Sequence, residues 1–286
     1  MIYLKTYCYS QHELPFVIAN LQEGFDCIDK LVLYEYNYTH TGIKKEYEME
    51  KVLHFVPEEL RCKLDYKKID LTKYNIFAYK NENGNPKIHQ HNEPIQRSWL
   101  FNDPDYNLKD EDIIIDHDID EIVYKNSYKP LIEELKRKRR PLSIKLNQFF
   151  FKNNYFWHDC NFSSPTIYKY SMVKNIGKNL RGLKIRNQRD LNQKTDKVYG
   201  CHMSWVMPAE FMIRKLHSYS HPEYRKYANL ELLEKSIKER KYVFNPGRSF
   251  NIKVLDHKDD KIPKYLQKEN IFDYELNDKG ILDIPK

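Results

Sequence analysis

Glycine, paired cysteines and long apolar runs are scarce in this sequence. Only 8 of the 286 residues are glycine, and no glycine-rich segment joins a strand pattern to a helix pattern. This argues against a P-loop and against a dinucleotide-binding fingerprint. The 5 cysteines are scattered without a Cys-x-x-Cys pair, so the sequence indicates neither a zinc ribbon nor a disulfide framework. A reducing compartment fits this cysteine usage best.

A targeting or membrane-spanning segment is also missing from the pattern. No apolar run approaches the roughly 20 residues that cross a bilayer. The first segment, Met1–Cys8, is too short for a signal peptide and is interrupted by Lys5. We therefore expect a cytoplasmic protein without a signal peptide or membrane anchor. The abundance of Lys, Asn, Ile and Tyr is typical of an AT-rich genome, such as that of some bacteria or large viruses.

The bulk composition is that of a folded, basic protein. Hydrophobic residues make up 41% of the chain and the formal net charge is +7. The first number supports a substantial core and excludes a disordered chain. The second indicates an anionic partner, for which a nucleotide diphosphate, an acidic glycan or a nucleic acid would each fit. The length suits one large α/β domain, expected over residues 1–250, with a C-terminal extension over 251–286 packed on or near it.

The amino-terminal pattern is strand, helix, strand and polar loop. Residues 2–7 and 30–34 read as strands, residues 11–22 carry a helical apolar stripe, and the polar segment Glu35–Gly42 follows the second strand. This order is typical of a nucleotide-binding half-sheet, so we predict an α/β fold with a mixed sheet flanked by helices. Further expected elements are helices over 44–53, 93–100, 128–140, 210–217 and 264–269, and strands over 66–71, 142–151 and 165–171.

The most informative stretch is Asp112–Ile122. Three consecutive isoleucines predict a buried strand, and Asp116, Asp118 and Asp120 follow at its carboxyl end, the edge where open α/β sheets bind ligands. Carboxylates this close tolerate one another best around a divalent cation, and Mg²⁺ and Mn²⁺ also bind substrate phosphates. An EF-hand loop is excluded, because Glu121 and Ser127 stand where that loop needs Gly and Glu. The remaining alternative is a solvated acidic turn.

Several segments in a shared order resemble glycosyltransferase family 17, whose best-known members are β-1,4-N-acetylglucosaminyltransferases acting on the core mannose of N-glycans. The matching segments are Asp29-Lys30, Glu35-Tyr36-Asn37, Gln96-Arg97, Asp118–Ile122, the set Gly200, His202, Ser204 and Trp205, then Glu210, the set Ser218, Ser220, His221 and Glu223, and Gly247-Arg248. The likeness spans roughly residues 2–250. Met203, Val206 and Met207 depart from the animal enzymes, and residues 155–196 do not match closely.

The resemblance implies a GT-A-like, Rossmann-related fold and an inverting, divalent-metal-dependent transfer of a sugar, N-acetylglucosamine, from a UDP-sugar to a glycan or glycoprotein acceptor. It places Mn²⁺ (or Mg²⁺) at Asp118 and Asp120, with His202 as third ligand or His221 in its place. A Mn²⁺ site accepts imidazole more readily than a Mg²⁺ site. A buried strand histidine with purely structural contacts is the alternative for His202.

The remaining candidates complete the expected reaction. Glu210 or Glu223 would be the general base, unless both are helix-surface carboxylates. The other donor-binding candidates are Glu35, Asn37, Arg97 and Asp118, of which Glu35 and Asn37 would bind the base or ribose and Arg97 a phosphate or the donor sugar. Tyr155 or Trp157 would stack against an acceptor sugar. The competing functions are a metal-dependent phosphoesterase and, with no recognisable binding motif to support it, a basic nucleic-acid-binding protein.

Overall fold

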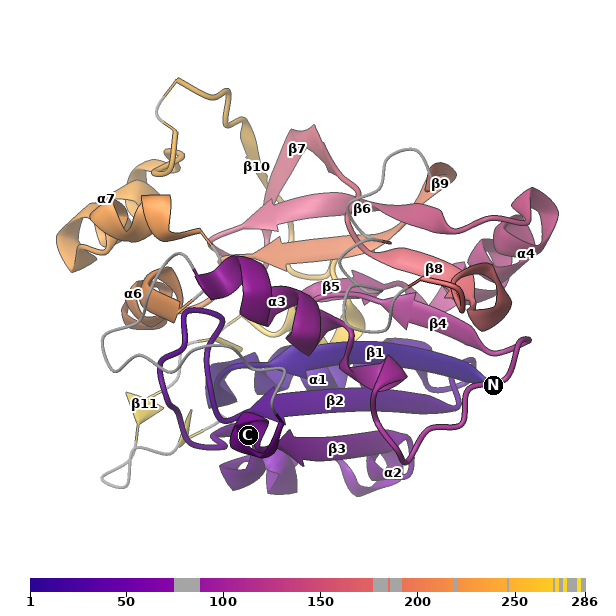
Figure 1. Cartoon of the computed structure of the whole chain (residues 1–286). Coiled ribbons are helices and arrows are strands. Elements are labelled where there is room, and N and C mark those ends of the chain that lie inside the picture. Colours follow the sequence, from indigo (N-terminus) through magenta and orange to yellow (C-terminus); the bar gives the residue numbers. More distant parts are fainter. Residues whose placement is uncertain are drawn as a thin grey trace.

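The computed structural model describes residues 1–74, 88–176, 185, 192–218, 221–245, 247–269, 271–272, 275–276 and 282–283. Its centre is a single mixed sheet with helices on both faces (Figure 1). The predicted α/β class, with a mixed sheet flanked by helices, is confirmed. No helix in these ranges is long and apolar enough to cross a membrane.

One half of the sheet is parallel. Strands β1 (Ile2–Cys8), β2 (Lys30–Tyr36), β3 (Leu64–Ile69) and β4 (Ile113–Asp116) lie in the order β3-β2-β1-β4. The order reverses between β1 and β4, because the chain builds outward through β2 and β3 and then returns to the other side of β1. In open α/β sheets, ligands bind outside the carboxyl ends of the strands at such a reversal.

The other half of the sheet is largely antiparallel. Its strands are β8 (Thr166–Lys169), β6 (Leu142–Phe150), β7 (Tyr155–Phe162) and β10 (Ile252–Val254), with β9 (Gln193–Ser204) parallel to β6 and β5 (Glu121–Val123) antiparallel to β9. Gly200 allows the close approach of β9 to β5, since a Cβ there would lie 2.0 Å from the carbonyl oxygen of Ile122. Close packing of β9 against β5 therefore explains why the sequence motif has glycine at position 200.

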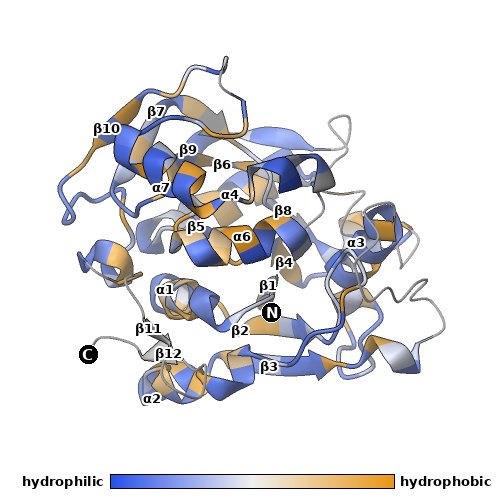
Figure 2. Ribbon diagram, turned by 90° about the vertical axis from the view of Figure 1, so that its left-hand side faces the viewer, coloured by the Kyte–Doolittle hydropathy of each residue, from blue (hydrophilic) through white to orange (hydrophobic). Residues whose placement is uncertain are grey.

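Both faces of the parallel half are buried, and alternate residues serve the two faces. Leu31 and Leu33 pack with α1 (Leu14–Gly24) in one apolar cluster, whereas Val32 and Tyr34 belong to a second cluster. The second cluster includes Ile95 of α3 (His89–Arg97). Figure 2 shows α1 and α3 on opposite sides of the sheet. The other α-helices in the described part of the chain are α2 (Glu58–Arg61), α4 (Tyr128–Lys138), α6 (Ala209–Ser218) and α7 (Leu230–Glu239).

The prediction of a helix over residues 44–53 is wrong. The structure has two short 3-10 turns there, Met49–Lys51 and Leu53–Phe55. The backbone N–H groups of Glu48 and Met49 donate to the carboxylate of Glu35 instead of continuing a helical ladder. A buried side chain from the neighbouring strand has therefore replaced local helical hydrogen bonds.

The segment after residue 250 is attached to the sheet and to the core. Strand β10 pairs with β7, with Val254 opposite Tyr155. Leu255, Ile262 and Leu266 are buried in the cluster that also contains α1. The predicted helix over 264–269 is a 3-10 turn, Lys264–Gln267. The division at residue 250 stays a prediction.

Candidate functional site

A cavity of about 1150 Å³ opens at the carboxyl edge of the parallel strands. Residues that follow β1 (Tyr9–Glu13) and residues that follow β4 (Asp118–Asp120) line it from the sheet. Helices α3 and α6 supply further walls, the latter through Lys215. The cavity thus lies where the strand order reverses, the position expected of a ligand site in an open α/β sheet.

Asp118 is paired with Arg97 at the end of α3. One guanidinium nitrogen donates to Asp118 Oδ1 at 2.6 Å, and Arg97 Nε donates to Glu93 Oε1 at 2.7 Å. Burial alone raises the pKa of Glu93, but Arg97 and His40 outweigh it and lower that pKa to about 2. Burial lowers the pKa of Arg97, whereas Asp118, Tyr7 and Glu93 raise it well above its ordinary value. Glu93 and Arg97 are therefore charged at neutral pH, and the contacts of Arg97 with Glu93 and Asp118 hold the three side chains in place.

Gln96, which precedes Arg97 in the Gln-Arg motif, has a structural role. Gln96 is buried. Its side-chain Nε2 donates to the Tyr38 carbonyl at 3.1 Å, and its backbone carbonyl accepts from the Tyr36 hydroxyl at 2.7 Å. Lys5 of β1, itself buried, donates to the Arg97 carbonyl and to Asp116 Oδ1. These contacts attach the end of α3 to β1 and β2 and so position Arg97 beside the cavity.

Asp120 lies deeper, between His202 of β9 and Lys215 of α6. Asp120 Oδ1 is 3.7 Å from His202 Nε2, and Oδ2 is 3.4 Å from Lys215 Nζ. Burial raises the pKa of Asp120, but Lys215 and His202 outweigh burial and lower that pKa to about 2. Asp120 is thus a carboxylate at any physiological pH, although it is almost completely buried.

The turn between β4 and β5 that carries both aspartates is held by hydrogen bonds. His117 Nδ1 donates to the carbonyl oxygens of Asp118 and Glu121, each at 2.8 Å. Burial lowers the pKa of His117 to about 4, so it is neutral. The Asp118 N–H donates to Glu121 Oε2 at 2.6 Å, and the Met203 N–H to the Asp120 carbonyl at 2.7 Å. Asp118 and Asp120 therefore project from a rigid loop.

The ring orientation of His202 suits a metal ligand. Gln148 Nε2 donates to the Phe149 carbonyl, so its Oε1 faces His202 Nδ1 at 3.0 Å and accepts the proton of that nitrogen. In the neutral ring the Nε2 lone pair then points at Asp120 Oδ1, and two electron-pair donors face each other. A cation between them, or a proton on Nε2, removes the repulsion. The donor set of one carboxylate and one imidazole fits Mn²⁺.

Within the described ranges, no group of three or more His, Cys, Asp or Glu side chains is arranged to hold a metal ion. A divalent ion bound by Asp120 and His202 would take its other ligands from a diphosphate and water, as Mg²⁺ sites commonly do. Asp118, predicted to share the ion, has Arg97 on its Oδ1 instead. Its present contact therefore favours a role in positioning Arg97.

The structure brings together five of the nine predicted site residues. Arg97, Asp118, Asp120, His202 and His221 line the cavity. Four others do not line it: Glu35, Asn37, Glu210 and Glu223.

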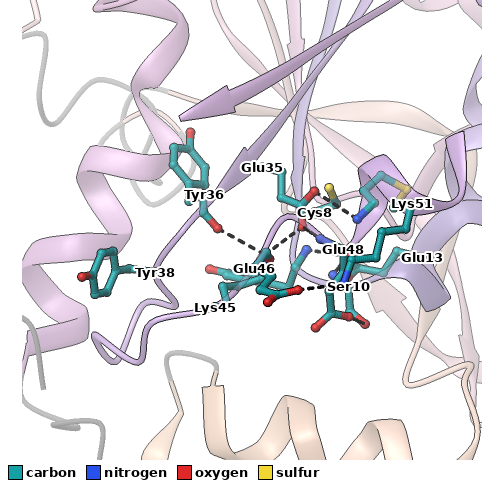
Figure 3. Close-up of polar contacts among 12 residues, drawn as sticks. Cys8, Ser10, Glu13, Glu35, Tyr36, Tyr38, Lys45, Glu46, Glu48 and Lys51 are labelled. Atoms are coloured by element: carbon teal, nitrogen blue, oxygen red, sulfur yellow. Dashed lines mark hydrogen bonds and ion pairs between the residues drawn. The ribbon is translucent and has the colours of Figure 1, made fainter. Parts of the chain in front are cut away.

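Glu35 is fully buried beneath the segment that forms one rim of the cavity (Figure 3). Its carboxylate accepts from Lys45 Nζ at 2.8 Å, from Tyr66 at 2.6 Å, and from the N–H groups of Glu48 and Met49. Lys45 and Glu48 line the cavity themselves. These contacts favour an indirect role, in which Glu35 holds the rim that a ligand would touch.

Asn37 has a comparable local role. Its side-chain Nδ2 donates to Asp70 Oδ1 at 2.6 Å, and its side-chain Oδ1 accepts from the Leu71 N–H at 2.9 Å. These bonds join the end of β2 to the turn after β3. Binding of a base or ribose by Glu35 or Asn37 stays a prediction.

The two candidate bases differ in their surroundings. Glu210 is exposed in the first turn of α6. Glu223, on the 3-10 turn η10 (Pro222–Tyr227), is 2.9 Å from Nδ1 of His221, which does line the cavity. Glu223 is thus connected to the cavity through an imidazole.

Two further charged residues that line the cavity, Lys215 and Glu93, were not predicted. Lys215 reaches Asp120 across 95 positions of sequence, so no local pattern could reveal the pair. Glu93 stands four residues before Arg97 on the same helix, a spacing that brings two side chains together and could have indicated the ion pair. Tyr155 and Trp157, expected beneath an acceptor sugar, do not line the cavity, and Trp157 is buried.

Comparisons with known proteins give limited information. No protein-family model matches the sequence, and no curated protein matches it. Among solved structures, TarS of S. aureus (residues 1–349) aligns with a TM-score of 0.37 and 14% identity, over 83% of this chain and 72% of that chain. The galactosyltransferase LgtC, in complex with donor and acceptor sugar analogs, aligns with a TM-score of 0.37 and 8% identity, over 79% and 83%.

A Bacillus anthracis protein assigned as a glucose-1-phosphate thymidylyltransferase, in complex with sucrose, aligns with a TM-score of 0.34 and 9% identity, over 70% of this chain and 88% of that chain. These scores and identities are too low to assign an activity to this chain. The function proposed below therefore depends on the cavity, on the residues that line it and on the sequence motifs.

Proposed function

We propose that the protein is a divalent-metal-dependent glycosyltransferase that transfers a sugar, N-acetylglucosamine, from a UDP-sugar to a glycan acceptor with inversion. The observation that carries the proposal is the arrangement of Asp120, His202 and Lys215 in a large cavity at the reversal of strand order. The donor sugar, the nucleotide and the inversion come from the likeness of the sequence motifs to glycosyltransferase family 17.

Breaking the bond between a sugar and UDP leaves negative charge on the diphosphate. Asp120 and His202 would hold Mn²⁺ (or Mg²⁺), which supplies Lewis-acid stabilisation of that charge when bound. Lys215 stands 3.4 Å from Asp120 and is placed to donate to a phosphate oxygen as well. Arg97, fixed by Asp118 and Glu93, presents a second cation to the same cavity.

An inverting transfer also needs a group that accepts the proton of the attacking hydroxyl. We propose His221 for this role, because it lines the cavity and its Nδ1 is held by Glu223 at 2.9 Å. A carboxylate on one ring nitrogen orients the imidazole, and the other nitrogen, Nε2, would receive the proton. The acceptor oxygen bonds to C1 of the sugar as the bond from C1 to the diphosphate oxygen breaks, and UDP leaves on the opposite face.

A donor screen tests this proposal. The protein would be incubated with Mn²⁺, a mannose-containing N-glycan core and UDP-, GDP- or CMP-sugars, and nucleotide release would be measured. We expect release from UDP-N-acetylglucosamine, its loss with EDTA and its return with excess Mn²⁺. Release from none of the donors contradicts the proposal. Hydrolysis of p-nitrophenyl phosphate, or a salt-sensitive gel shift with nucleic acid, would support one of the competing functions instead.

A further inference from the structure

A second wall of the cavity is aromatic. Among the described residues, five aromatic rings form this wall, and they come from the antiparallel half of the sheet and the segments that follow β9: Phe162, Trp205, Tyr224, Tyr242 and Phe244. We call this set the aromatic wall. None of its residues is among the predicted donor-binding residues, and Trp205 ends the sequence motif that begins at Gly200.

Four rings of the aromatic wall pack together: Trp205, Tyr224, Tyr242 and Phe244. Phe244 lies at their centre, with ring centroids 4.7 Å from Trp205, 5.0 Å from Tyr224 and 5.7 Å from Tyr242. Phe244 and Trp205 are buried, whereas Tyr224, Tyr242 and Phe162 remain partly exposed. Aromatic pairs at these separations attract one another and need little reorganisation to receive a flat ligand.

Trp205 is held in an unusual backbone conformation. Its φ is 58°, in the left-handed region that a bulky residue rarely adopts. Such strain persists where the surrounding structure determines it and is concentrated at binding sites. Here it coincides with the point where β9 ends and the cavity begins.

One end of the aromatic wall lies beside the residues proposed to bind the metal and the diphosphate. The Phe162 ring lies 4.0 Å from the His202 ring, and Lys215 Nζ lies 5.1 Å from the Trp205 ring while also contacting Asp120. At its other end the Tyr224 ring stacks 5.7 Å from His221. A ligand on this wall would therefore lie between the groups that hold the diphosphate and the proposed base.

We propose that the aromatic wall is the acceptor subsite and that it binds a neutral pyranoside. One face of a pyranose ring presents C–H groups, which pack against an aromatic face, while its hydroxyls point outward to polar partners. Ser164, Ser204 and Ser218 also line the cavity and offer hydroxyl groups. The role as acceptor subsite rests on the proposed function; binding of the sugar ring depends only on the aromatic wall.

Saturation-transfer NMR tests the inference with methyl β-D-glucopyranoside, methyl α-D-mannopyranoside and chitobiose as probes. We expect at least one to bind the wild type, with saturation concentrated on the C–H protons of one ring face. Tyr242→Ala and Tyr224→Ala should each weaken that binding about fivefold, because each removes one stacked ring. Tyr242→Phe should retain it.

Tyr155→Ala is the matched control, since Tyr155 is a partly exposed aromatic residue of β7 outside the cavity. Melting temperatures report whether each variant is folded, and Tyr224→Ala decides the matter if Tyr242→Ala unfolds. Absence of binding by all three sugars, or binding unchanged in the folded alanine variants, would overturn the inference. Stabilisation by UDP with Mn²⁺ is measured in parallel; its absence alongside sugar binding would refute the proposed function and leave the sugar subsite standing.

Discussion

The two walls of the cavity are built in different ways. The charged wall comes from the loops after β1 and β4 and from α3 and α6, and ion pairs such as Arg97 with Asp118 hold its side chains. The aromatic wall comes from the antiparallel half and its extension, and ring packing holds it. The difference separates two tasks: fixed charges suit a constant diphosphate, whereas packed aromatic rings suit a sugar whose hydroxyls vary.

Removing the central carboxylate should disable the charged wall alone. Asp120→Asn takes away the charge that pairs with Lys215 and would bind the metal with His202. We expect about a 10³-fold loss of transfer, because stabilisation of the leaving diphosphate is lost. Nucleotide release from UDP-N-acetylglucosamine measures the effect.

The control for this variant is Asp105→Asn, since Asp105 is exposed and pairs only with Lys67 among the ion pairs found. Binding of the methyl glycosides should be unchanged in Asp120→Asn. Full activity of Asp120→Asn, retained in EDTA, would remove the metal from the mechanism.

The second comparison concerns the two predicted bases. Glu223→Gln removes the carboxylate that orients His221, so we expect turnover to fall about 10–100-fold, with a changed pH profile and little change in donor affinity. Glu210→Gln should change turnover less than about threefold, because a surface carboxylate outside the cavity acts on the reaction only weakly. The reverse order of effects would return the role of base to Glu210.

Lys215 connects the two walls, because it contacts Asp120 and lies over the Trp205 ring. Lys215→Gln should weaken UDP binding about tenfold, as expected for one charge-assisted hydrogen bond to phosphate. Isothermal titration with UDP and Mn²⁺ measures it. Lys226→Gln, on η10 and outside the cavity, serves as the control. An unchanged affinity in Lys215→Gln would separate this lysine from the diphosphate.

The last prediction concerns stability rather than activity. Burial raises the pKa of Glu13 to about 7, despite Lys215 and the Tyr9 N–H, which lower it. The folded state therefore retains a proton that the unfolded chain releases, and stability should fall between about pH 4.5 and 7, by on the order of 3 kcal/mol. Glu13→Gln keeps an acceptor for the Tyr9 N–H and should flatten this slope. An equal slope in both proteins, measured by thermal unfolding, would contradict the assignment.

The sheet edge was predictable because its signals are local. Three isoleucines followed by spaced aspartates predicted a buried strand and its acidic end, and Ile114 and Ile115 are fully buried in β4. Asp118 and Asp120, predicted from the same stretch to lie at a ligand site, line the cavity, and their role as metal ligands stays a prediction. Contacts between distant segments left no such pattern, and Lys215 was missed for that reason.

Glu35 shows where the prediction lost accuracy. It was predicted to begin the loop after a strand over 30–34, but β2 extends to Tyr36 and includes it. Strand periodicity then puts Glu35 on the same face as Leu31 and Leu33, which is buried. A strand end alone therefore predicts the region of a site, while the alternation of side chains decides which residues face it. Applied to Glu35, that rule indicates a buried carboxylate that needs donors, and Lys45 and Tyr66 are among those it finds.

The most direct test of the central claim is a crystal of the protein soaked with MnCl₂ and UDP, with the anomalous signal of manganese used to locate the ion. We predict a manganese peak bonded to Asp120 and His202, with the diphosphate oxygens on its remaining positions and Lys215 beside them. A well-diffracting crystal with no manganese at Asp120, or with UDP bound elsewhere, would contradict it.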